Sequence, residues 1–321
     1  MLTFVVRRVL YSVPVLLVAS FLLFTFVRLT FDPTDRLRQS RDPGAVERAR
    51  HELGLDRPIP VQYTDWLSKF VRGDWGESTR TSERVFPIIR RSLWNTSQLI
   101  IWGILLAAVV AISVGVFSAV RQYSAPDYLF TGVSFLALAM PPFWFGLLAI
   151  QFFAVYPRQW FNLAHTPFFF VGLHSSTAPG FADYARHLVL PVLTLTVQII
   201  ASWSRYQRAS MLDALSADYV RTARAKGVPQ RQVIVKHAMR NALIPLVTVM
   251  ALDIGLLFGG LVITEQIFSI PGMGRLFIDS LVAGDANVLV VWSVITASFV
   301  IAFNLLADVL YGVLDPRIRN A

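Results

Sequence analysis

The longest basic segment between two apolar stretches extends from Asp218 to Pro245. It carries one acid, Asp218, against six basic side chains: Arg221, Arg224, Lys226, Arg231, Lys236 and Arg240. Ala, Arg, Lys and Val dominate, and Gly227 and Pro229 interrupt the run. This composition predicts a short helix, a turn and a second helix that leads into the next apolar stretch. Such a segment could rest on anionic lipid or be pushed by a cytosolic partner protein.

One acid lies within an apolar stretch, where its charge is costly. Asp253 falls in the segment from Asn241 to Thr264, and an ionisable residue in such a segment is a functional-site candidate. Two interpretations are open: Asp253 lines a translocation path, or it hydrogen-bonds another helix. Gly255 and Gly259 follow in the G-x-x-x-G spacing that allows close helix packing.

Other chemical groups are sparse. The chain has no cysteine, and none of its three lysines (Lys69, Lys226 and Lys236) precedes Ser or Thr, so a P-loop for ATP phosphates is missing. No H-E-x-x-H or G-x-S-x-G motif is present. Three histidines lack metal-site spacing, and we expect surface or interfacial residues and no metal site at His165, His174 and His187.

The composition indicates an integral membrane protein. Of 321 residues, 55% are hydrophobic and 15% are charged, against about 25% charged in soluble domains. The net charge of +9 is divided among segments by apolar runs, so we expect membrane topology and no nucleic-acid partner. We predict an all-α fold with six transmembrane helices, because six runs approach or exceed the roughly 20 residues that span a bilayer: residues 9–27, 92–120, 128–157, 187–204, 241–264 and 286–307.

Charge placement predicts the topology. Residues 204–240 hold eight Lys or Arg and two Asp, so this short loop should face the cytoplasm together with both termini. The nearly neutral insert after the first helix should lie outside. We therefore divide the chain into residues 1–29 (N-terminus and first helix), 30–95 (external insert), 96–311 (transmembrane core with a cytoplasmic loop at 205–240) and 312–321 (cytoplasmic tail).

Local signals refine this plan. Pro141 and Pro142 should break the third span, and irregular backbone at membrane depth is tolerated where it is buried in protein or lines a path. In the insert we expect a helix over 43–54, an extended turn at Pro58 and Pro60, and packing onto the membrane domain by Trp66, Phe70 and Trp75. The segment 265–274 reads as a turn-rich external loop.

Several motifs together resemble one family. RTARAKG at 221–227 followed by KHAMRNALIP, LGLDRPIPVQYTDW at 53–66, GDWGES at 73–78, EQIFSIPGMG at 265–274 and the LDPR ending are similar to the B-type permease of the oligopeptide/dipeptide/nickel branch of ABC importers, most like an oligopeptide permease. The wider family's E-A-A-x-x-x-G motif has Arg221 at the Glu position and Thr222 at the first Ala, whereas Ala223 and Gly227 match.

The resemblance implies an ABC type I importer-like permease in the cytoplasmic membrane. It also implies a second permease, two cytosolic ABC ATPase domains that bind ATP and Mg, and an external peptide-binding protein, with no cofactor in this chain. Residues 213–227 would form a coupling helix that ends at Gly227 and Pro229. The ATPase-coupling residues would be Asp218, Tyr219, Arg221, Thr222, Ala223, Arg224, Lys226 and Gly227.

Further roles follow from the same reading. We expect the translocation path to include Pro141, Pro142, Asp253 and Gly259, and contact with the binding protein at Trp75 and Glu265. The insert could equally be a small structural cap.

Three alternatives stay open. Nickel or another small solute is a second cargo class, although spans two, three, five and six contain no His or Cys, which favours peptides. An ATPase-independent channel or secondary transporter would predict internal repeats and several intramembrane charges. A membrane receptor or scaffold would not transport at all.

Overall fold

The computed structural model describes residues 2–32, 34, 44–52, 54–175 and 180–314. Within these residues the regular structure is helical, with one isolated antiparallel bridge between Glu77 and Arg84. The helices are α1 (Leu2–Thr30), α2 (Ala45–Glu52), α3 (Ile59–Val71), α4 (Val85–Val120), α5 (Ala125–Ala139), α6 (Pro142–Ile150), α7 (Tyr156–Trp160), α8 (Phe181–Ser216), α9 (Asp218–Ala225), α10 (Gln230–Gln232), α11 (Met239–Leu257), α12 (Val262–Ile267), α13 (Met273–Ala283) and α14 (Ala286–Leu314), with π-helical segments η2 (Gln151–Val155) and η3 (Val233–Ala238).

Five helical segments of the described chain are long and apolar enough to cross a membrane, and a bent pair raises the number to six if it counts as one span. The five are Val6–Thr30, Val85–Val120, Phe181–Ser216, Gln230–Leu257 and Ala286–Leu310, and the bent pair is Ala125–Ala139 with Pro142–Trp160. The predicted all-α membrane architecture is therefore confirmed, with five to six candidate spans.

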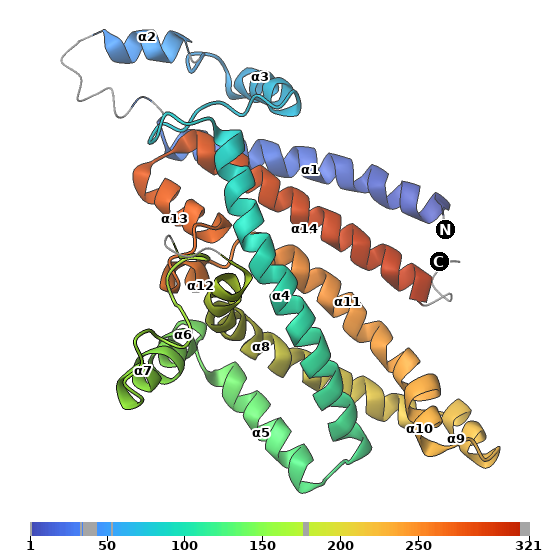
Figure 1. Ribbon diagram of the computed structural model, residues 1–321. Coiled ribbons are helices and arrows are strands. Elements are labelled where there is room, and N and C mark those ends of the chain that lie inside the picture. Colours follow the sequence, from blue (N-terminus) through green and yellow to red (C-terminus); the bar gives the residue numbers. More distant parts are fainter. Residues whose placement is uncertain (1, 33, 35–43, 53, 176–179, 315–321) are drawn as a thin grey trace.

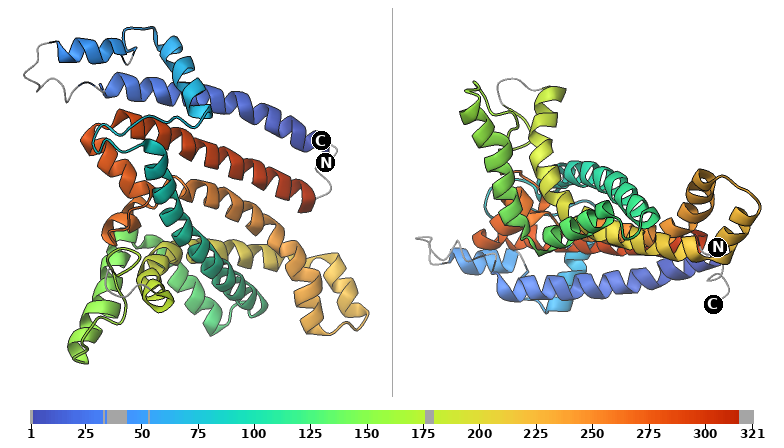
Figure 2. Two further views of the ribbon diagram at one scale, coloured as in Figure 1. Left: turned by 45° about the horizontal axis from the view of Figure 1, so that its top comes forward. Right: turned by 90° about the horizontal axis from the view of Figure 1, so that it is seen from below.

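The spanning helices form a bundle with two distinct ends. α14 packs between α1 and α11, and α4 packs along α8. The insert with α2 and α3 lies at one end (Figure 1), while α9, α10, the start of α1 and the end of α14 lie at the other, as both views in Figure 2 also show. The first described residues of α1 and the last described residues of α14 thus lie at the same end of the bundle as the basic segment.

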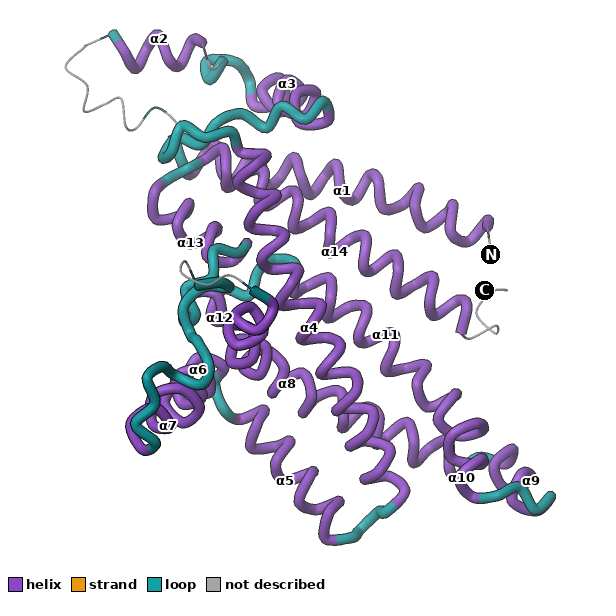
Figure 3. Tube along the Cα trace, in the orientation of Figure 1, coloured by secondary structure: helices purple, strands orange, loops and turns teal. Residues whose placement is uncertain are grey.

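The third span is broken where the two prolines predicted it. α5 ends at Ala139, α6 begins at Pro142, and their axes differ by 103°. Figure 3 shows the short loop between them. The Gln198 side chain of α8 donates to the carbonyl oxygen of Met140 at 2.8 Å, so a carbonyl at the break is satisfied by a neighbouring helix.

The insert contains a helix, α3, at a position where Pro58 and Pro60 predicted an extended turn. Helix α2 lies within the range predicted for residues 43–54, whose positions 43 and 53 fall outside the described residues. The extended turn predicted at Pro58 and Pro60 is wrong in part: Pro58 is extended, but Pro60 lies in the first turn of α3. Proline is well tolerated there because the first N–H groups of a helix lack intrahelical partners.

The predicted packing of the insert onto the membrane domain is confirmed. Trp66 contacts buried apolar residues of α1 and α14, and Phe70 and Trp75 contact a second cluster at the start of α4. The rings of Trp66, Phe70 and Trp75 stack in series, with centroids 4.9 and 5.2 Å apart. Ser78 then donates to the Asp285 carboxylate at 2.5 Å, which ties the insert to the turn before α14.

The structure corrects three predictions about helix ends and burial. The fourth span is the middle of a longer helix, α8, so His187 is buried against Phe169, with ring centroids 4.6 Å apart, and is not a surface residue. The fifth span ends at Leu257, not at Thr264. The segment 265–274 has the predicted turns at residues 268–272, between α12 and α13, but it is not a surface loop, because Phe268 and Ile270 are completely buried in the main core.

The substitution Gly115→Ala tests how closely α4 packs on α8, because Gly115 of α4 faces α8. A Cβ there would lie 2.6 Å from Cβ of Gln207 and 2.8 Å from the Ser204 carbonyl oxygen. Gly115→Ala should therefore lower stability by about 1–3 kcal/mol, measured as thermal unfolding of the detergent-purified protein. Gly132→Ala is the matched control, because nothing lies within 4 Å of its Cβ position; it should be neutral or stabilising by up to about 1 kcal/mol. Equal midpoints for the two variants would contradict the packing.

Candidate functional site

The basic segment folds as a helix with one buried and one exposed face. Val220 and Ala223 are buried, while the rest of the predicted coupling set is exposed: Asp218, Tyr219, Arg221, Thr222, Arg224, Lys226 and Gly227. Arg221 lies 3.6 Å from Asp218, but both side chains are largely exposed, so this pair is worth little. The exposed face of α9 is therefore free to meet another surface.

The buried face of α9 joins it to the spanning helices. Val220 and Ala223 pack in one apolar cluster with Ala119 of α4, Met211 of α8 and Ala242 of α11, together with Ala214, Val233 and Ala238. The cluster therefore packs α9 against one end of each of three spanning helices.

The predicted helix over 213–227 is wrong at its start. α8 continues to Ser216, Ala217 is extended with ψ of 150°, and α9 begins at Asp218. The predicted end is confirmed, since Gly227 has a φ of +75°, a conformation that glycine adopts without strain. α9 is thus a separate two-turn helix joined to α8 by a single extended residue.

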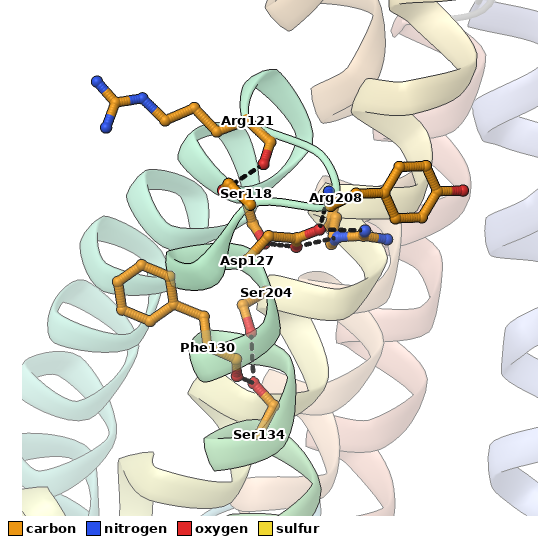
Figure 4. A network of polar contacts seen from close by, with 9 residues as sticks. Ser118, Arg121, Asp127, Phe130, Ser134, Ser204 and Arg208 are labelled. Atoms are coloured by element: carbon orange, nitrogen blue, oxygen red, sulfur yellow. Dashed lines mark hydrogen bonds and ion pairs between the residues drawn. The ribbon is translucent and has the colours of Figure 1, made fainter.

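A polar network missed by sequence reasoning ties α4, α5 and α8 together (Figure 4). Asp127, at the start of α5, accepts two hydrogen bonds from Arg208 of α8, each 2.8 Å long. The same carboxylate accepts from the hydroxyl of Ser118 on α4 and from the backbone N–H of Tyr123. Asp127 is 2% exposed, so this bidentate pair is largely shielded from water.

The predicted path residues lie at breaks in the bundle. Pro141 is exposed and Pro142 half-buried, both at the bend between α5 and α6. Gly259 follows the end of α11, and a Cβ there would lie 3.1 Å from Thr296 of α14. Asp253 hydrogen-bonds another helix, accepting from the indole N–H of Trp203 at 2.7 Å, as the second of the two interpretations expected.

The two residues predicted at an external contact differ in exposure. Trp75 is half-buried. Glu265 has no exposed surface; it accepts from the Thr96 hydroxyl at 2.6 Å and from the backbone N–H of Arg275 at 2.9 Å in the first turn of α13. Burial raises the pKa of the Glu265 carboxyl, against these hydrogen bonds. A partner could reach this carboxylate only after the network opened.

No three His, Asp or Glu side chains of the described chain come together as a metal-binding group. The feature that the basic segment builds is the packed unit of α9 with the helix ends beneath it.

Comparison with known proteins decides what this unit belongs to. The family model described as binding-protein-dependent transport system inner membrane component matches residues 111–320, and the model of its N-terminal membrane component matches residues 1–115. The chain belongs to this family. Family membership makes it the permease component of an ABC transporter and a multi-pass membrane protein, and it favours the permease interpretation over a channel or scaffold.

The relatives of this permease match it over its whole length. The oligopeptide transport system permease protein AppB of Bacillus subtilis is 39% identical over 325 residues, covering 99% of this chain and 100% of the relative. OppB of Mycobacterium tuberculosis, with the same descriptive name, is 37% identical over 330 residues, with 99% of each chain covered. The di/tripeptide transport system permease protein DppB of Pseudomonas aeruginosa is 36% identical over 340 residues, covering 100% of this chain and 99% of the relative.

Removing one member of the buried ion pair should destabilise the permease. Asp127→Ala leaves Arg208 without its carboxylate and should cost about 3 kcal/mol, seen as a lower thermal midpoint in detergent. Replacing both residues by Ala should recover part of the loss, because no charge is then left unpaired. Arg90→Lys on α4, at an exposed position, is the control and should change stability by less than about 0.5 kcal/mol. An Asp127→Ala variant as stable as this control would show that the pair does not hold the helices.

Proposed function

We propose that the chain is the B-type permease subunit of an ATP-driven importer that passes oligopeptides or dipeptides across the cytoplasmic membrane. The observation that carries the proposal is α9, an exposed cationic helix fixed by its apolar face onto the inner ends of α4, α8 and α11. Relatives named for oligopeptide and di/tripeptide transport match the whole chain, which supports peptides over nickel or another small solute as the cargo.

The importer needs subunits that this chain does not supply. None of its lysines stands in a P-loop sequence, so ATP and Mg would be bound by two cytosolic ABC ATPase domains. A second homologous permease would complete the path, and an external peptide-binding protein would deliver the cargo. The exposed edge of the insert around Trp75 is the surface we assign to that delivery.

The basic segment gives the orientation. Lys and Arg are retained on the cytoplasmic side, so the end of the bundle with α9 and α10 would face the cytoplasm. The start of α1 and the end of α14 lie at this end, which supports a cytoplasmic position for both termini and an external position for the insert.

Coupling would work by rigid-body transmission. α9 would lie in a groove of the ATPase, with Arg221, Arg224 and Lys226 facing acidic or backbone groups there. Closure of the ATPase pair on ATP would move α9, and the apolar cluster beneath it would carry the motion into α4, α8 and α11. The bend at Pro141 and the break after α11 are where the path between the two permeases would open and close.

Reversing the charge on α9 should uncouple transport. The triple variant Arg221→Glu, Arg224→Glu and Lys226→Glu should lose at least about tenfold of ATP-dependent peptide uptake, because three favourable charges at the ATPase groove become repulsive. Uptake is measured in proteoliposomes that contain the assembled importer and its binding protein.

A charge-keeping triple variant is the control for this experiment. Arg221→Lys, Arg224→Lys and Lys226→Arg alters the same three exposed positions and should retain most of the uptake. Wild-type uptake by the charge-reversed variant would contradict the assignment of α9 as the coupling helix.

A further inference from the structure

Asp253 lies in the apolar part of α11, and no ion pair is formed by its carboxylate within the described chain. Within the described chain, Asp127 pairs with Arg208 at 2.8 Å, and Asp308 pairs with Arg8 at 3.0 Å. Asp253 forms no ion pair there; its hydrogen-bond partner is the indole N–H of Trp203, at 2.7 Å from one carboxylate oxygen. A charge in the membrane without a counter-charge is costly, so the structure leaves a place for a cation.

The surroundings hold this carboxylate in a fixed orientation. Trp203 is completely buried, in a cluster with Ala107 and Ala111 of α4 and Leu246 of α11. An indole locked in this way aims its N–H at one oxygen of Asp253, and the half-buried carboxylate has acceptor capacity left for a second ligand. The arrangement is a pre-oriented acceptor rather than a mobile surface charge.

The backbone near Asp253 also favours a cation. α11 ends at Leu257, one turn beyond Asp253, and the chain then breaks at Gly259 and Gly260, where Gly260 has a φ of +103°. The C-terminal end of a helix carries partial negative charge. Broken helices in membrane transporters use such ends to bind cations within the bilayer.

We propose that Asp253 binds a primary ammonium group of the cargo, the terminal amino group of a peptide, as the cargo crosses the membrane. The inference rests on the proposed function. A metal ion is a poorer occupant, because hard cations need several oxygen ligands and no group of three His, Asp or Glu forms among the described residues. An ammonium needs one carboxylate and a charge-assisted hydrogen bond.

The test compares three forms of one tripeptide in proteoliposomes with the complete importer. The free peptide and its N,N-dimethyl form carry the positive charge, and the N-acetyl form lacks it. Each peptide is supplied at a concentration that saturates the binding protein. For each peptide we compare the uptake rate of the variant with that of the wild type, so any preference of the binding protein affects both rates equally and cancels. Asp253→Asn keeps an oxygen for the Trp203 indole and removes the charge.

The proposal predicts that Asp253→Asn lowers uptake of both charged peptides about tenfold or more and lowers uptake of the acetylated peptide less than about twofold. Asp253→Glu should restore part of the charged-peptide uptake. Asp308→Asn, an equivalent acid-to-amide change in α14, should affect all three peptides alike.

Two outcomes overturn the proposal. Unchanged uptake of all three peptides by Asp253→Asn would show that the charge is not used. An equal loss for all three would show that Asp253 is held protonated or paired with a cation of the second permease. Failure of the wild-type importer to take up the free peptide with ATP would instead count against the proposed function, so the two failures are distinguishable.

Discussion

The bilayer requires every backbone N–H and C=O to find a partner within the protein, and the architecture follows from this requirement. Continuous helices satisfy it along most of the chain. At the two breaks, neighbouring groups satisfy it: Gln198 donates to the carbonyl of Met140, and the Glu265 carboxylate with the Thr96 hydroxyl accepts N–H groups at the start of α13. The irregular backbone at both breaks is therefore supported from the side, and under the proposed function these are the places where we expect a path to form.

At the end of the bundle that carries α9, the helices are joined by an ion pair and by an apolar cluster. The Asp127–Arg208 pair joins α5 to α8, and the apolar cluster joins α9 to α4, α8 and α11. An interface built from packed side chains does not deform continuously, so under the proposed function a force on α9 would move these helix ends as a unit. The breaks farther from α9 would then be the places where that motion changes the geometry of a path.

The sequence predicted the architecture where local signals are strong. Long apolar runs indicated the spans, the Pro141–Pro142 pair indicated the bend, and Gly227 marked the end of α9. The errors at Glu265 and His187 have a common physical cause, which is that burial depends on contacts distant in sequence. Glu265 reads as a polar loop residue until α13 and Thr96 surround it, and His187 reads as a surface residue until Phe169 covers it. Asp127 and Arg208 are 81 positions apart, so nothing local connects them.

The central claim is that this permease works as part of a complex whose energy source lies in other subunits. The most direct test is affinity purification of the tagged chain in mild detergent, with mass spectrometry of the proteins that come with it. The account predicts a second membrane permease and one or two P-loop ATPases in stable amounts. A chain that purifies alone at every salt concentration would contradict it.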